Sequence, residues 1–388
     1  MTASAMPLRL SWDRAIVYGA LLALLTSLPF VLFFPAWFHD VAFRGDFANF
    51  WSAGANVGTL NLLDPAGLAA WQLAHHIKPQ IFVYPPGVAW FYAPLARLLP
   101  MPAMTLEELG MAVVLAAAGF LAARIYNFST WFALIAVFAW APAVNAIEVG
   151  QNTPVALLAI LLAIWALVNR REGVAGLAVG LLFYKPSVAL PFVVLLLVRK
   201  EWRALGVMCL TATAWYFLGV LAAHGAFSWP SQYIHLVAQS SVDEFVGNSH
   251  KTYTIPTLLL SAGAPIAVAL AGAVAVFAAA VPLLGRRPAI EAASMAGAVG
   301  VATSLHAWPY EAVVLLPAVF YGMGRLSEPA RTWIIAGAYV VATLALSLPH
   351  AGHALALLPI SAAAWWLWSG YHHRSRRVSC PAQTGVGT

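Results

Sequence analysis

The sequence predicts an all-α polytopic membrane protein, with about 12 transmembrane helices in a single bundle. Its 388 residues are 62% hydrophobic and only 9% charged, whereas ordinary soluble domains carry about 25% charged residues. The mean hydropathy is +0.81. A chain this apolar cannot cover a water-facing surface, so the bilayer must be its solvent. We assign residues 1–370 to one transmembrane domain and residues 371–388 to a disordered cytoplasmic tail.

Apolar runs predict the individual spans. They lie near residues 15–34, 83–99, 105–124, 152–169, 173–184, 187–198, 203–223, 255–284, 289–305, 311–324, 332–348 and 352–370. A further apolar run, 130–143, contains Pro142, and counting it as a full crossing breaks the charge pattern that follows. We therefore interpret this run as a half-helix or a re-entrant segment.

Basic residues orient the predicted spans. With a cytoplasmic N-terminus, most of the 20 Lys and Arg residues fall on the cytoplasmic side, as the positive-inside rule requires. The exceptions are Arg44, Lys78, Arg124, Lys185 and Lys251. This clustering also explains the net charge of +6 without a nucleic-acid partner. Both termini are then cytoplasmic, and the two longest polar loops, about 35–82 and 225–253, face outwards.

Asp46 is the most reactive-looking residue of the first outer loop. It lies about a dozen residues past the first predicted span, in the run FRGDFANFW. In helical register Phe47, Phe50 and Trp51 share one face and Asn49 lies beside it, which predicts an interfacial helix. Asp46 could be a reactive carboxylate, or it could only cap this helix. The spacing does not decide between the two.

Two other features of the same loop favour a structural role first. Asp64 followed by Pro65 predicts a turn and the start of a second interfacial helix. Tyr84 precedes a proline pair that makes the chain extended and rigid at the start of the next predicted span. That rigidity would hold Tyr84 at the mouth of a site.

Three further outer boundaries carry polar side chains. Gln151 and Asn152 could bind sugar hydroxyls, or they could cap the helix that follows. Lys185 interrupts a long apolar stretch, so either two short helices meet there or a lysine lies at membrane depth. Intramembrane lysines are costly and usually functional, and an anionic lipid phosphate is the obvious partner. Tyr310 and Glu311 lie near His306 at the junction of two spans, where they could cap a helix or line a site.

The loop 225–253 could form a lid or simply be solvated, and the sequence leaves both open. The motifs of several soluble enzymes are absent from the sequence, including a Walker A loop, HExxH and GxSxG. Nucleotide-driven chemistry in the cytoplasm is therefore not expected.

The runs RGDFANFWSAG, VYPPGVAWFYAPLARLLP, VGQNTP and LLFYKPSVALP, in this order between spans, resemble glycosyltransferase family 87. These are bacterial membrane enzymes of the GT-C class, and they include mannosyltransferases that use polyprenyl-phosphate mannose. The similarity covers most of the chain up to about residue 205 and continues more weakly through SLHAWPYEAVVLLP. It implies a GT-C-type bundle in the cell inner membrane, with the active site on the periplasmic face.

The resemblance also implies roles for individual residues. The family's aspartate falls on Asp46, which would be the general base of an inverting sugar transfer. Lys185, with Arg44 and His306 behind it, would stabilise the departing lipid phosphate. We expect mannose as the sugar, a glycolipid or glycan as the acceptor, and neither a metal ion nor a cofactor. Residues predicted to contact the substrates are Asn49, Trp51, Tyr84, Gln151, Asn152, Tyr310 and Glu311.

A polytopic lipid or solute transporter is the alternative interpretation. It would also carry a lysine within the membrane and polar residues outside it. Transporters, however, place polar residues at the bilayer midplane, often across inverted repeats. Here the polar residues gather on one side, which favours the enzyme.

Overall fold

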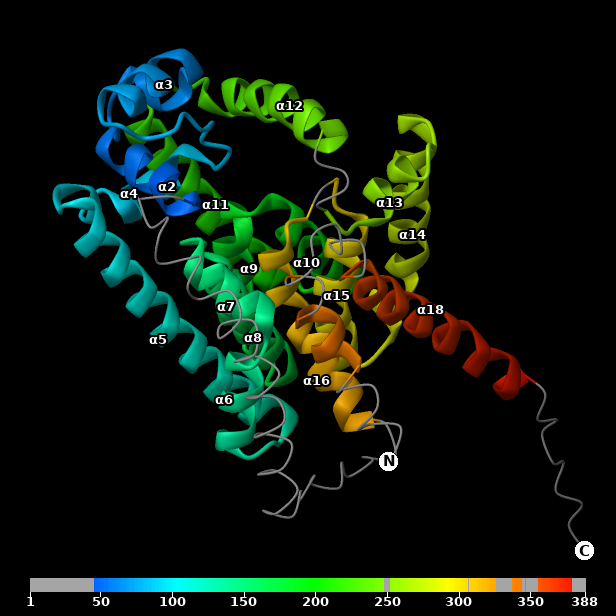
Figure 1. Cartoon of the computed structure of the whole chain (residues 1–388). Helices are drawn as coiled ribbons and strands as arrows, with labels where there is room; N and C mark the ends of the chain where they lie inside the picture. The colour runs from blue at the N-terminus through cyan, green and yellow to red at the C-terminus, as the bar shows by residue number, and fades with distance from the viewer. Residues whose placement is uncertain are drawn as a thin grey trace, which may run out of the picture.

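The computed structural model describes residues 45–247, 252–305, 307–325, 337–343, 346 and 355–378. Over these ranges the protein contains helices and no strand, which confirms the all-α prediction (Figure 1). The predicted first span, 15–34, lies outside the described residues, as do most of the predicted span 332–348 and two predicted site residues, Arg44 and His306.

Three helices of the described chain are long and apolar enough to cross a membrane. They are α5 (Pro100–Tyr126), α11 (Trp202–Ala222) and α14 (Ile266–Arg286). Shorter apolar helices match the other predicted runs: α8 (Thr153–Val168), α9 (Glu172–Leu181) with the 3-10 turn η4 (Leu182–Tyr184), α10 (Pro186–Val198) and α15 (Ala289–Thr303). These helices are what a membrane protein requires, while the total of about 12 crossings stays a prediction.

The predicted span 83–99 is not a continuous helix. The chain forms three short pieces there: η2 (Pro86–Val88), α4 (Ala89–Tyr92) and η3 (Leu95–Arg97). Pro94 explains the break between α4 and η3, because it lacks the backbone N–H that a helix interior needs, whereas Pro85 and Pro86 stand at the start of η2. The predicted span 255–284 is likewise divided, into α13 (Ile255–Ser261) and α14. Gly263, with a φ of 83°, and Pro265 separate the two helices.

The segment after α5 returns the chain to the end at which α5 began. α6 (Thr130–Phe138) and α7 (Ala141–Glu148) are bent by 60° relative to each other. α5 carries the chain about 40 Å away from α2 (Asp46–Ala55). α7 nevertheless ends beside α2, since Asp46 N donates to the Val149 carbonyl at 2.9 Å. The pair is therefore a broken crossing rather than the half-helix or re-entrant segment predicted from the sequence.

This return crossing corrects the sides of two basic residues. Arg97 lies just before α5, at the Asp46 end, and Arg124 lies in its last turn, at the far end. The prediction placed Arg97 on the cytoplasmic side and Arg124 on the outer side, the reverse of this arrangement. One predicted crossing is lost at 83–99 and one is gained at α6–α7, so every residue after α7 keeps its predicted side. The excess of basic residues on the far side is unchanged, because the two exceptions simply exchange places.

Small residues let the central helices pack closely. α8 is buried along most of its length, between α5, α9 and α15. A Cβ at Gly176 of α9 would lie 2.1 Å from the Ala204 carbonyl oxygen of α11. A Cβ at Gly180, also in α9, would lie 2.5 Å from the Cβ of Thr211, also in α11. Such contacts between small residues are the usual way in which membrane helices associate, because lipid offers no hydrophobic driving force between them.

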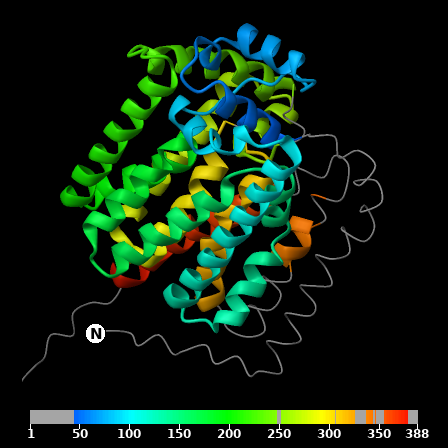
Figure 2. The ribbon, with the colours of Figure 1, turned by 90° about the vertical axis from the view of Figure 1, so that its left-hand side faces the viewer.

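Three helices gather at one end of the bundle. These are α2, α3 (Pro65–Ala74) and α12 (Trp229–Gly247), and the blue α2 and α3 stay at the upper end in a view turned by 90° (Figures 1 and 2). Asp64 begins α3 as predicted: its carboxylate accepts from Ala66 N at 3.1 Å. α12 occupies much of the loop 225–253, and the Tyr233 hydroxyl donates to the Val83 carbonyl at 3.2 Å.

α2 is an internal helix rather than the predicted interfacial one. Its aromatic face is buried against protein, with Phe50 stacked on Tyr92 at 4.6 Å between ring centroids and tilted against Tyr84 at 4.8 Å. The helical spacing correctly predicted a shared aromatic face, but this face packs against the segment 82–92 instead of lipid. At the other end of the chain, α16 (Leu316–Arg325) follows the 3-10 helix η6 (Pro309–Leu315), and α18 (Leu357–Val378) continues beyond the boundary predicted at Gly370.

Candidate active site

A pair of glycine turns fixes the start of α2. Asp46 N and Phe47 N both donate to the Val149 carbonyl, at 2.9 and 3.2 Å. Gly45 has a φ of 87° and Gly150 a φ of 68°, the left-handed region that glycine enters without strain. A Cβ on Gly150 would lie only 2.3 Å from the Phe47 Cβ. The turn after α7 and the first turn of α2 are therefore in direct backbone contact.

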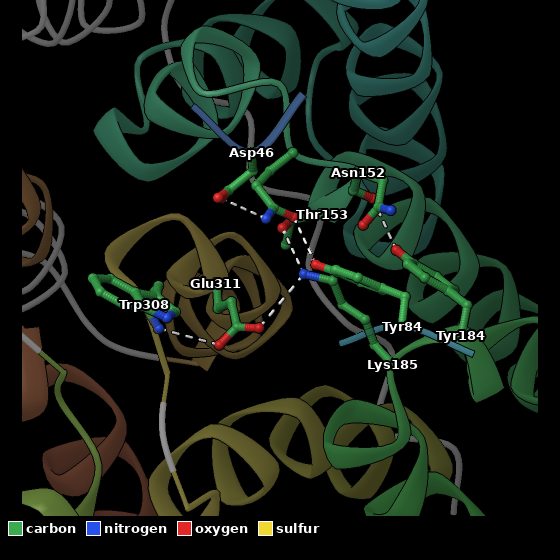
Figure 3. A network of polar contacts seen from close by, with 9 residues as sticks. Asp46, Tyr84, Asn152, Thr153, Tyr184, Lys185, Trp308 and Glu311 are labelled. Atoms are coloured by element: carbon green, nitrogen blue, oxygen red, sulfur yellow. Dashed lines mark hydrogen bonds and ion pairs between the residues drawn. The ribbon is translucent and has the colours of Figure 1, made fainter. Parts of the chain in front are cut away.

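This contact brings the Asp46 carboxylate to the side chain of Gln151. The Gln151 Nε2 donates to Asp46 Oδ2 at 2.6 Å, and the Tyr84 hydroxyl donates to Gln151 Oε1 at 2.9 Å (Figure 3). The N-cap of α2 is Gly45, and no side chain caps that helix. Asp46 is thus not the helix cap that the sequence left open, and its carboxylate is committed to a buried polar network.

Burial raises the pKa of the Asp46 carboxyl above its usual value. Hydrogen bonds from Gln151 and Tyr310 and the charge of Lys185 oppose this rise, while the charge of Glu311 adds to it. Asp46 lies outside the candidate membrane spans. A carboxylate with a raised pKa binds a proton more readily, which is the property that a general base needs.

Lys185 stands where two short helices meet, the first of the two arrangements predicted for it. It follows η4 and precedes α10, and it is only 4% exposed. Its Nζ donates to Thr153 Oγ1 at 3.1 Å and pairs with Glu311 Oε1 at 3.5 Å. The rings of Tyr84 and Tyr310 lie 5.8 and 5.5 Å from the same nitrogen. The Lys185 ammonium is therefore a buried cation, held beside the Asp46 network by one carboxylate and two aromatic rings.

Glu311 caps a helix, one of the two interpretations that the sequence left open, and it also pairs with Lys185; its role in a substrate site stays a prediction. Its Oε2 accepts from Trp308 N at 3.2 Å and so caps η6, while its Oε1 faces Lys185 (Figure 3). Tyr310, the neighbouring residue, contacts Lys185 through its ring. The third residue predicted at this junction, His306, lies outside the described residues.

The remaining predicted site residues support the network without joining it. Asn49 is buried and donates through Nδ2 to the Ile81 carbonyl at 2.9 Å. Trp51 packs against Trp71 at 5.9 Å between centroids. Asn152 holds the N-cap position of α8 without a side-chain cap bond, and its carbonyl accepts from Tyr184. The predicted role of these three residues in substrate binding stays a prediction.

Thr153 belongs to this network, although its position in the sequence did not mark it as a site residue. Its hydroxyl is fully buried and accepts from Lys185. The available signal was its place in Gly-Gln-Asn-Thr-Pro, directly after two residues already singled out.

A cavity of about 560 Å³ lies away from this network. It is lined by the last residues of α8 and by Arg170, Glu172, Arg199 and Glu201, whereas the Lys185 partner Thr153 is the first residue of α8. The cavity and the Asp46 network are thus at opposite ends of the same helix. In the part of the chain that the structure describes, no group of His, Cys, Asp and Glu side chains is arranged to hold a metal ion. Metal independence stays a prediction.

A family model for glycosyltransferase family 87 matches residues 82–309, more than half of the chain. The chain belongs to glycosyltransferase family 87. It is therefore a glycosyltransferase, as the resemblance implied, and membership of an enzyme family favours this function over the transporter alternative. No curated protein and no solved structure matches the chain.

The matched segment contains Tyr84, Gln151 and Lys185 but begins after Asp46 and ends before Glu311. Asp46 is joined to the matched segment by its contacts to Val149 and Gln151. Glu311 is joined to it by the ion pair with Lys185.

Proposed function

We propose that this glycosyltransferase moves a hexose, mannose in the first instance, from a polyprenyl-phosphate donor to a hydroxyl of a glycolipid or glycan acceptor. The transfer takes place on the periplasmic side of the cell inner membrane, with both chain termini in the cytoplasm. Asp46 is the general base and Lys185 binds the phosphate of the donor. Arg44 and His306 are further candidate phosphate contacts.

The observation that carries this proposal is the single buried network that contains both Asp46 and Lys185. Tyr84 joins its two halves: its hydroxyl bonds to Gln151, which holds Asp46, and its ring faces Lys185. The carboxylate and the ammonium come from segments far apart in the sequence. A base beside a cation suits a reaction in which one proton is removed and one phosphate departs.

The chemistry follows from these two groups. Asp46 takes the proton of the acceptor hydroxyl while the acceptor oxygen forms a bond to the anomeric carbon. The bond between that carbon and the phosphate oxygen breaks, and the phosphate leaves on its lipid with the bonding electrons. The ammonium of Lys185 stabilises the charge that develops on this phosphate. A single displacement of this kind inverts the anomeric configuration.

The donor is tested by incubating membranes that contain the protein with a panel of radiolabelled polyprenyl-phosphate sugars. We expect label to move from one of them to an extractable acceptor. Asp46→Asn abolishes this transfer while leaving folding and donor binding in place. The matched control is Asp64→Asn, which makes the same chemical change at an exposed helix cap and retains transfer. Near wild-type turnover by purified Asp46→Asn protein would remove Asp46 from the base role.

A further inference from the structure

We propose that Gln151 and Tyr84 form a relay that holds Asp46 by its Oδ2 and so positions the carboxylate to take the acceptor proton. In this role Gln151 is a positioning residue rather than the substrate contact that its sequence context suggested. The inference rests on the proposed function of Asp46 as the base.

The orientation of the Gln151 amide is determined by its two partners. An amide has a donor end and an acceptor end, which are told apart only by the groups they face. An ionised Asp46 carboxylate can only accept, so Nε2 is the end that reaches Asp46 Oδ2 at 2.6 Å, and Oε1 is left to accept from the Tyr84 hydroxyl at 2.9 Å. The reversed amide would place its carbonyl oxygen against an ionised carboxylate. By donating to Oε1, the Tyr84 hydroxyl therefore supports the orientation in which Gln151 stabilises charged Asp46.

Gln151 has little left to offer a sugar. Its side chain uses both ends of the amide and is only 2% exposed. Its backbone is also held, because Gln151 N donates to the Ala146 carbonyl at 2.7 Å. Both polar ends of the Gln151 amide are thus already engaged within the network, as a positioning role requires.

Tyr84 is held by its ring independently of its hydroxyl. The ring packs against Phe50 at 4.8 Å and Phe82 at 5.8 Å between centroids, and it faces Lys185. Replacing Tyr84 by phenylalanine keeps these ring contacts and removes only the donor to Gln151. This substitution therefore isolates the relay.

Several groups face Asp46, and the relay is one of them. Gln151 and Tyr310 donate hydrogen bonds to its carboxylate, Lys185 acts through its positive charge, and Glu311 opposes ionisation. Losing the Gln151 bond removes one of the interactions that favour the charged form. Ionised Asp46 then appears only at higher pH, and its carboxylate is free to rotate.

The test is the pH dependence of kcat/KM with a polyprenyl-phosphate sugar donor, for the variants Gln151→Leu and Tyr84→Phe. We expect the acidic limb of Gln151→Leu to move up by about one pH unit, equal to about a tenfold loss of rate on that limb. Tyr84→Phe moves it in the same direction by less, and the double variant moves it no further than Gln151→Leu. Tyr184→Phe is the matched control, because it removes another buried tyrosine hydroxyl that bonds to Asn152 instead, and its midpoint stays that of the wild type.

Two outcomes overturn the relay. One is an unmoved midpoint in Gln151→Leu with a raised KM for a single substrate, which makes Gln151 a substrate contact. The other is an unmoved midpoint in Tyr84→Phe, which decides the question even if Gln151→Leu does not fold. Turnover by Asp46→Asn would refute the base itself, so failure of the relay and failure of the proposed function are told apart.

Discussion

Gly150→Ala perturbs the active site without removing any of its functional groups. The new Cβ would lie 2.3 Å from the Phe47 Cβ, whereas ordinary contacts lie at 3.4–4 Å. The first turn of α2 must therefore move away from Val149 by about 1 Å, and Asp46 moves with it. A displacement of that size within a catalytic constellation can cost about 100-fold in rate. The left-handed φ of 68° adds a cost of about 1 kcal/mol in stability.

The assay separates the two effects. We expect kcat for sugar transfer to fall by about 100-fold in Gly150→Ala, with a small change in the thermal midpoint of the purified protein. Gly263→Ala is the matched control: Gly263 also has a positive φ, 83°, but a Cβ there meets nothing within 4 Å. It shares the backbone cost and keeps the turnover. A Gly150→Ala enzyme as active as Gly263→Ala would refute the claim that close contact at Gly150 positions Asp46.

Three further predictions concern the charged groups. The rate falls as the pH drops through the pKa of Asp46. Because burial raises that pKa, kcat/KM declines at a higher pH than the usual aspartate pKa of about 3.9 would require. A decline only below that value contradicts the assignment of Asp46 as the base. Lys185→Ala raises KM for the lipid-phosphate donor more than for the acceptor, and equal effects in steady-state kinetics would make Lys185 structural. Glu311→Ala leaves the Lys185 ammonium without its carboxylate and lowers the free energy of unfolding by about 3 kcal/mol, against about 1 kcal/mol for Asp64→Ala at an exposed cap. Thermal midpoints in detergent that rank the two variants the other way argue against a buried ion pair.

Helix type and several boundaries were predictable because apolar runs and prolines act locally. The run 203–223 became α11, and Asp64 began α3 with Pro65 in its first turn. The error at 83–99 has a local cause as well: hydropathy counts apolar residues, but Pro94 lacks the backbone N–H that a continuous helix would need there. The error at 130–143 arose because the charge pattern tests only the net number of crossings. One crossing too many at 83–99 and one too few at 130–143 cancel, so the pattern of basic residues stays intact.

The partners of the polar residues were not predictable in the same way. Asp46 was recognised as a possible base, but its neighbours Gln151 and Tyr310 lie far along the chain. Lys185 was recognised as costly to bury, and a lipid phosphate was named as its partner, yet the side chains that hold it are Thr153 and Glu311. A residue's chemistry is a property of its type, whereas its partners depend on which helices cross.

The helical, membrane-embedded character of this protein follows from its amino-acid sequence, because 62% hydrophobic content and basic clusters are properties of composition and order. It also singled out Asp46 and Lys185, since a carboxylate and an ammonium stand out in an apolar chain. The folded arrangement was needed to see that Gln151 joins Asp46 to Tyr84, and that the ring of Tyr84 faces Lys185. The physical reason is that these contacts require two glycine turns to bring α2 and α7 into backbone contact, and such an approach depends on packing across the whole bundle rather than on any local pattern.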